Sequence, residues 1–141
     1  MKKLLALCFP LVLSASLAHA QQGVTKDEIL IGSIQDLSGP IAGFGKQARF
    51  GMQLAVDEIN ELGGINGRKL TWVSYDDGYN PAKTVEMARK LVEQDEVLFI
   101  FNVLGTPPNS SIHKYMNQKK VPQLFNATGA TKWGDPKNSP Y

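Results

Sequence analysis

Small hydrogen-bonding side chains recur in chain segments that are rich in glycine and proline. They are Ser38, Thr106, Asn109, Asn126 and Thr128. Hydroxyl and amide groups of this kind can hold a carboxylate or another oxygen-rich group of a small molecule. The segments themselves contain no lysine or arginine, and Lys46 directly follows the first of them. This shortage of cations favours a small solute over a polyphosphate.

The adjacent acids Asp76 and Asp77 are the main candidates for catalysis, because paired carboxylates can hold a metal ion or accept a phosphoryl group. No further acid or histidine stands near them in sequence. Aspartate is also common in turns and before helices, where it accepts hydrogen bonds from backbone N–H groups. We therefore expect the pair to form a turn, and we expect no metal site and no cofactor.

Other motifs are weaker. Gly43, Gly45 and Ala48 fit a dinucleotide-binding pattern, but about nine residues separate them from the preceding strand and no acid follows at the required spacing. His113 is alone on a helix and is expected to be a partly exposed helical residue.

Phe44 lies between two glycines. Its ring either folds under its own loop or forms one wall of a ligand pocket.

The segments that must position these residues alternate between apolar runs and helical patterns. Runs typical of buried strands span residues 29–34, 70–75, 97–101 and 122–125. Two apolar stripes at helical spacing lie between them: Ala48, Met52, Ala55, Ile59 and Leu62, then Val85, Ala88, Leu91 and Val92.

Helix boundaries follow from caps and breakers. Gly63-Gly64 is expected to end the first helix, Asn80-Pro81 to begin the second, and Asn109 to cap a third that runs to about residue 119. The order of elements predicts an α/β fold with a parallel sheet and flanking helices. In such sheets ligands bind in the loops at the carboxyl ends of the strands, here residues 35–45, 76–80, 102–109 and 126–131.

The N-terminal 20 residues have the features of a secretory signal. Lys2 and Lys3 precede an apolar stretch from Leu4 to Leu17, and Ala18-His19-Ala20 is a small-x-small cleavage site. We expect cleavage before Gln21 and a periplasmic protein. The chain has one cysteine, Cys8, so residues 21–141 contain no disulfide and no thiol.

The charge balance excludes some partners. Of 15 lysines and arginines, two lie in the signal segment, which leaves 13 against 13 aspartates and glutamates. A neutral balance argues against nucleic acid and anionic membranes as partners.

Three motifs in order carry a family resemblance. They are Leu37-Ser38-Gly39-Pro40 with Phe44-Gly45, then AVDEINELGGING at residues 55–67, then Tyr75-Asp76-Asp77 with Pro81. Together they resemble the first lobe of the extracytoplasmic solute-binding proteins of ABC transporters, of the leucine/isoleucine/valine-binding, type I periplasmic type. The resemblance implies that residues 21–141 form part of an N-terminal lobe, with the second lobe absent.

The resemblance also implies a ligand site and a partner. Members hold a solute carboxylate with first-lobe hydroxyl and backbone N–H groups, which maps to Gly105, Thr106, Asn126, Ala127 and Thr128, with Phe44 as the aromatic wall. The complete protein would capture an amino acid, amide or related carboxylate and deliver it to an ABC permease in the inner membrane, without chemistry.

Besides the absent second lobe, this sequence departs from the family pattern in two places. Pro107-Pro108 follows Thr106 where relatives often have serines, and Gly78-Tyr79 follows the acidic pair where some relatives have a disulfide. Two alternatives to the transport function stay open: a sensor domain of the same fold, and an α/β enzyme that uses Asp76 and Asp77.

Overall fold

The computed structural model describes residues 21–141, so the expected signal segment lies outside the described residues. The strands are β1 (Glu28–Gln35), β2 (Lys69–Asp76), β3 (Ile100–Phe101) and β4 (Gln123–Leu124). The helices are α1 (Ala42–Glu61), α2 (Pro81–Arg89), α3 (Thr106–Lys119), the π-helical turn η1 (Lys90–Gln94) and the 3₁₀ turn η2 (Thr131–Gly134).

The strands form one parallel sheet in the order β2-β1-β3-β4, which confirms the predicted α/β class. β1 and β2 pair along eight residues, from Glu28 with Lys69 to Gln35 with Asp76. The third and fourth strands are shorter than predicted. β3 begins three residues later than predicted and ends where predicted, before Asn102, and β4 ends before Phe125; these two residues have φ values of 56° and 53°, a left-handed backbone that ends each strand.

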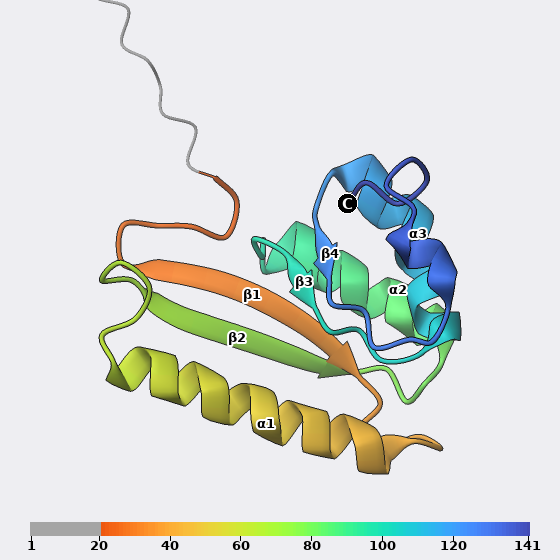
Figure 1. Cartoon of the computed structure of the whole chain (residues 1–141), viewed down its shortest axis with the longest axis horizontal. Coiled ribbons are helices and arrows are strands. Elements are labelled where there is room, and N and C mark those ends of the chain that lie inside the picture. The colour runs from red at the N-terminus through yellow and green to blue at the C-terminus, as the bar shows by residue number, and fades with distance from the viewer. Residues whose placement is uncertain (1–20) are drawn as a thin grey trace, which may run out of the picture.

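The two faces of the sheet are covered unequally. In Figure 1, α1 runs along one face beside β1 and β2, while α2 and α3 lie on the other side. The side of α2 and α3 contains the main core, in which Ile34, Leu91, Ile100, Ile112 and Met116 have no exposed surface. Burying an aliphatic side chain of this size contributes about 1.5–3 kcal/mol. Helix α2 and η1 supply the predicted inner stripe to this core.

The predicted buried stripe of α1 is wrong. Of the apolar residues of this helix only Val56 is buried, together with Ile31 and Leu70 of the sheet. Leu62, a member of the predicted stripe, is 81% exposed. The stripe instead borders an apolar groove between α1 and the sheet, because no described element packs on that flank of the helix.

Helix α1 also begins earlier than predicted. It starts at Ala42, so Phe44 and Gly45 belong to its first turn and not to a loop. Glycine is needed at residue 45 because a β-carbon there would lie 1.9 Å from the backbone oxygen of Asp36. The Asp36 carboxylate prepares this entry by accepting hydrogen bonds from the N–H groups of Gly39 and Ile41.

Of the two predicted asparagine caps, one is confirmed and the other is wrong. Asn80 caps α2 as predicted, since its Oδ1 accepts hydrogen bonds from Ala82 and Lys83. Asn109 does not cap α3, because the helix begins three residues earlier, at Thr106. Prolines are tolerated in the first turn of a helix, where their missing N–H groups would lack partners.

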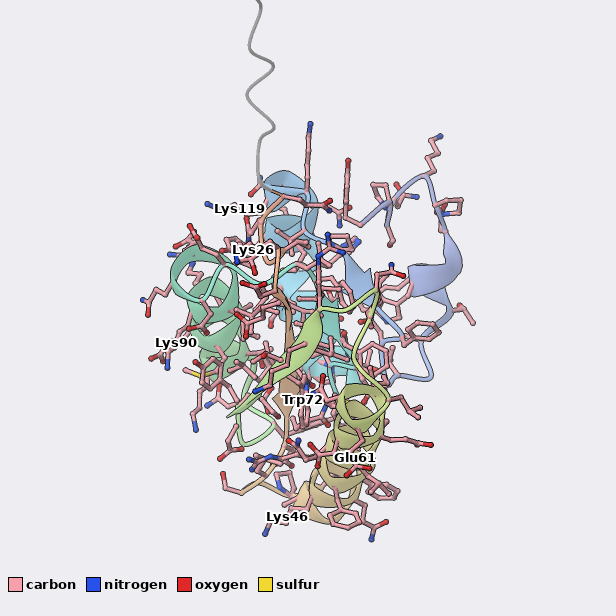
Figure 2. The ribbon with its side chains drawn as sticks, turned by 90° about the vertical axis from the view of Figure 1, so that its left-hand side faces the viewer. Lys26, Lys46, Glu61, Trp72, Lys90 and Lys119 are labelled. Carbon is pink, nitrogen blue, oxygen red and sulfur yellow. The ribbon has the colours of Figure 1, made fainter. Side chains whose placement is uncertain are left out.

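Charged side chains and Trp72 take different places around the ribbon. Lys46 and Lys90 lie at the edges in Figure 2, whereas Trp72 lies between the ribbons of β2 and α1. The Lys90 ammonium lies 4.1 Å from the centroid of the Tyr75 ring. No helix within residues 21–141 combines the length and apolar character needed to cross a bilayer.

Candidate functional site

The loops after β3 and β4 meet at the carboxyl end of the sheet. The hydroxyl oxygens of Thr106 and Thr128 are 2.6 Å apart, although 22 residues separate them. The backbone aligns them, because Leu104 and Ala127 form a parallel bridge and Gly105 N donates to Ala127 O at 2.9 Å. These bonds extend the β3–β4 pairing beyond the strands. We call the two side chains the threonine pair.

Asn109 fixes the backbone before the threonine pair. Its buried side-chain amide donates to Val103 O at 2.8 Å and to Gly105 O at 2.7 Å. Its Oδ1 accepts a hydrogen bond from Gln123 of β4. A satisfied buried network of this kind holds its members in one arrangement. Asn109 therefore holds the backbone segment that precedes Thr106 in place.

Gly105 and Tyr79 are in close contact. Gly105 has φ 101° and ψ 145°, a conformation that favours glycine. A β-carbon at Gly105 would lie 2.2 Å from Cε2 of Tyr79. The Tyr79 ring thus packs directly on the residue before the threonine pair, and it joins the β2–α2 turn to the β3–α3 loop. No spacing signal in the sequence indicates this contact.

The first turn of α3 offers few amide donors. Pro107 and Pro108 have no N–H, and the N–H groups of Gly105 and Ala127 are used within the backbone ladder. The Thr106 N–H makes no hydrogen bond within residues 21–141. The polar groups that this edge of the sheet presents are therefore mainly hydroxyls.

The remaining predicted site residues lie around the threonine pair or beside it. Asn126 is half-buried, its backbone oxygen accepts from Thr128 N at 2.9 Å, and its side-chain oxygen receives no hydrogen bond from the described residues. Phe44 is 72% exposed on the first turn of α1. Its ring is therefore not folded under its own loop, which removes one of its two predicted roles.

The acidic pair stabilises turns. The Asp76 carboxylate accepts from Ser38 Oγ at 2.6 Å, from Leu37 N at 2.8 Å and from Gly78 N at 2.9 Å. Burial acts to raise the pKa of Asp76, but these three bonds outweigh it and hold the pKa below its usual value. The carboxylate thereby ties the loop after β1 to the turn after β2.

The pKa of Asp77 is shifted in the opposite direction. It is almost fully buried and accepts from Thr84 Oγ1 at 2.7 Å and from Tyr79 N at 2.9 Å. Burial raises the pKa of its carboxyl group, even though both hydrogen bonds act in the other direction. Within residues 21–141, no three histidine, cysteine or acidic side chains are arranged so that they could hold a metal ion.

Sequence reasoning missed one cation near the site. Lys132, in η2, donates from its ammonium to Ser110 Oγ at 2.8 Å. Ser110 stands one helical turn after Thr106. Lys132 follows the predicted loop of residues 126–131 by one position, so a slightly wider window in the sequence would have included it.

Comparison with known proteins decides the family. Residues 28–141 match the family model described as periplasmic binding protein. The chain belongs to the periplasmic binding protein family. The Leu/Ile/Val/Thr-binding protein of Salmonella typhimurium is 37% identical over 116 residues, which cover 80% of this chain and 30% of that protein.

Solved structures of periplasmic binding proteins are similar to this chain. A branched-chain amino acid transporter substrate-binding protein from Streptococcus pneumoniae, in complex with isoleucine, has a TM-score of 0.75 at 27% identity and covers 82% of this chain. A solute-binding protein of an ABC transporter from Rhodopseudomonas palustris, in complex with 3,4-dihydroxybenzoic acid, has a TM-score of 0.71 at 28% identity, again over 82% of this chain.

The chain spans less than a third of the length of each of these relatives, at 30%, 32% and 31%. The matched periplasmic binding proteins are solute-binding proteins and not enzymes, which confirms that expectation for this chain. The family match therefore favours solute binding over the alternative of an enzyme built on Asp76 and Asp77.

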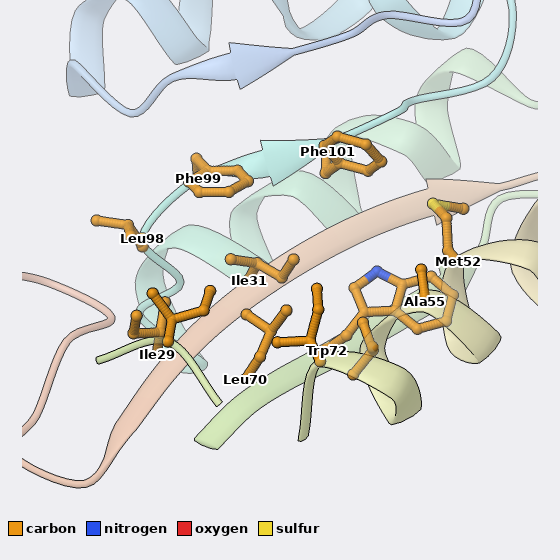
Figure 3. Close-up of a pocket in the computed structure, with 12 residues that line it drawn as sticks. Ile29, Ile31, Met52, Ala55, Leu70, Trp72, Leu98, Phe99 and Phe101 are labelled. Atoms are coloured by element: carbon orange, nitrogen blue, oxygen red, sulfur yellow. The ribbon is translucent and has the colours of Figure 1, made fainter. Parts of the chain in front are cut away.

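The apolar groove is separate from this site. Its cavity of about 400 Å³ is lined by twelve apolar residues from α1, the sheet and the adjoining loops. Figure 3 shows Ile31, Trp72, Phe99 and Phe101 on the sheet side and Met52 and Ala55 on the helix side. The lining offers no charged group for a zwitterionic or anionic solute. The groove is thus unsuited to hold such a solute.

Proposed function

We propose that this protein is the substrate-binding component of an ABC importer. It captures a small organic solute in the periplasm, such as a branched-chain amino acid, an amide or a related carboxylate, and delivers it to a permease in the inner membrane. The observation that carries this proposal is the threonine pair, held at the carboxyl ends of β3 and β4 in a protein of the periplasmic binding family. Residues 21–141 supply part of the first of two lobes.

Each candidate residue has a role in this proposal. Thr106 and Thr128 donate hydrogen bonds to a solute oxygen through their hydroxyl groups. Gly105, Asn126 and Ala127 hold the two loops in register, through the bond from Gly105 N to Ala127 O and the bond from Thr128 N to Asn126 O. The exposed ring of Phe44 packs against the apolar part of the solute.

Titration calorimetry tests the proposed function. The gene product, with any sequence that its gene encodes beyond residue 141, is titrated with L-leucine, L-valine, acetamide and 3,4-dihydroxybenzoate. We expect at least one of them to bind in the micromolar range or more tightly. Failure of all four to bind would contradict the proposal in its present form.

Export is a separate part of the proposal. The positive start, the apolar stretch and the small-x-small site of residues 1–20 support cleavage after Ala20. Mass spectrometry of the protein from a periplasmic extract should identify Gln21 as its first residue. An N-terminus at Met1, or a lipid on Cys8, would contradict this prediction.

A further inference from the structure

The Lys132 ammonium is held beside the N-terminal part of α3 by two contacts. It donates to Ser110 Oγ at 2.8 Å, and it lies 4.4 Å from the centroid of the Trp133 ring. A cation over an aromatic face is attracted by the electrons of the ring. Trp133 is itself packed edge-on against His113 of α3, with ring centroids 5.1 Å apart. The position of the positive charge is therefore set by α3.

Hydrogen bonds of neighbouring groups link the surroundings of Lys132 to Thr106 and Thr128. Ser110 Oγ, which receives the lysine, donates to Thr106 O at 2.7 Å. On the other side, Thr128 Oγ1 accepts from Ala130 N at 3.2 Å, two residues before Lys132. The charge and the two hydroxyl groups thus belong to one local cluster of α3, η2 and the loop between β4 and η2.

The charges around this edge of the sheet are otherwise unfavourable to an anion. Asp36 follows β1, Asp76 ends β2 and Asp77 follows it, and the Lys83 ammonium lies 3.9 Å from an oxygen of Asp76. Pro107 and Pro108 remove two N–H donors from the first turn of α3. A solute carboxylate at the threonine pair would therefore receive few amide hydrogen bonds, and the three aspartates lie at the same carboxyl edge of the sheet.

We propose that Lys132 supplies the positive charge that selects an anionic solute, a carboxylate, at the threonine pair. This inference rests on the proposed function and narrows it, because it favours acids over neutral amides. The lysine acts as a specificity-determining residue through its charge. The hydroxyl groups of the threonine pair supply the directed hydrogen bonds.

The test compares an acid with its amide in two variants. The gene product and its Lys132→Gln variant are titrated with 3,4-dihydroxybenzoate and 3,4-dihydroxybenzamide, and with L-leucine and L-leucinamide. Lys137→Gln is the matched control, because it removes the same charge from the same segment. The hydrogen bond that Lys137 makes to Asp135 comes from its backbone N–H, which the substitution keeps. Melting temperatures without solute show whether each variant is folded.

We expect Lys132→Gln to weaken binding of the acid about fivefold and to change binding of the amide by less than twofold. The loss of acid binding should be smaller at high salt. Lys137→Gln should change neither. Equal loss of acid and amide, or no loss of the acid, would overturn the role of Lys132 and leave the proposed function standing. If the unmodified protein binds neither acid nor amide, the proposed function fails and this inference fails with it.

Discussion

At the scale of single residues, the candidate site depends on hydroxyl groups that are held by the backbone. Thr106 is exposed and Thr128 is half-buried, and in the 2.6 Å contact between their oxygens one hydroxyl donates to the other, so this bond must open before both can donate to a solute. The backbone bonds that align them do not use either side chain. Binding and stability should therefore respond differently to changes here.

Replacing Thr128 with valine should weaken solute binding by one to two decades. A hydrogen bond to a charged group contributes about 1.5–3 kcal/mol, and each 1.4 kcal/mol corresponds to about tenfold in affinity. The melting temperature without solute should change little. Thr71→Val is the control, because it makes the same atomic change in β2 and removes a hydroxyl that donates to Glu28. Unchanged affinity in Thr128→Val, measured by calorimetry, would refute the role of this residue.

Replacing Asp77 with asparagine should leave solute affinity unchanged and alter the pH dependence of stability. Burial raises the pKa of Asp77 above 3.8, its usual value, so protonation favours the folded state. The stability contributed by Asp77 is fully present below pH 3.8 and is lost as the pH rises through the folded-state pKa. Asparagine does not titrate, and it can still accept from Tyr79 N.

Thermal unfolding across this pH range checks the prediction. The free energy of unfolding of Asp77→Asn should rise relative to the unmodified protein as the pH increases through the folded-state pKa of Asp77. A variant that loses stability relative to the unmodified protein over the same interval would show that the carboxylate is stabilising. Loss of solute affinity in this variant would move the binding site toward the acidic turn.

At the scale of elements, the start of α1 determines what Phe44 can contact. Because the helix begins at Ala42, the ring stands on its first turn, at the end of the helix that lies near the carboxyl ends of β1 and β2. Phe50 has almost the same exposure, 74% against 72%, but it lies further along the helix. The two residues form a matched pair.

Phe44→Ala should weaken binding of apolar solutes more than binding of small polar ones, because it removes a wall and not an anchoring group. Phe50→Ala should change neither affinity. Calorimetry with L-leucine and acetamide measures the contrast. Equal effects of the two substitutions would show that Phe44 does not face the solute.

Periodicity and caps predicted most of the elements, and the failures have physical causes. Residues 35–45 were predicted as a loop, yet α1 begins at Ala42, and glycine is required at residue 45 because a β-carbon would collide with Asp36 O. Pro107 and Pro108 suggested a rigid loop but occupy the first turn of α3. The contacts of Tyr79 with Gly105 and of Lys132 with Ser110 join distant segments, and no local spacing encodes such contacts.

At the scale of the molecule, the sheet has one well-covered face and one partly open face. Helix α1 lies beside β2 and β1, and the apolar groove remains open between it and Phe99 and Phe101. Phe125, next to the edge strand β4, is 76% exposed. Apolar surface of this extent favours association or further packing.

Residues 21–141 alone should therefore be weakly stable. The open groove forgoes burial energy, and the edge strand β4 leaves unpaired backbone groups. Hydrogen exchange should show little protection in β3 and β4, and a dye that binds apolar surfaces should fluoresce strongly. A sharp two-state melt of this segment, with no dye binding, would argue against the prediction.

The contact between Tyr79 and Gly105 also restricts which residues can occur together during evolution. A side chain at position 105 would occupy the space of the ring, and the positive φ of Gly105 adds a second penalty. A descendant of this sequence could acquire alanine or a larger residue at position 105 only after losing the ring at position 79 and changing the local backbone. Positions 79 and 105 should therefore vary together. Homologues with an aromatic residue at position 79 and glycine at position 105 should share this contact between the two loops.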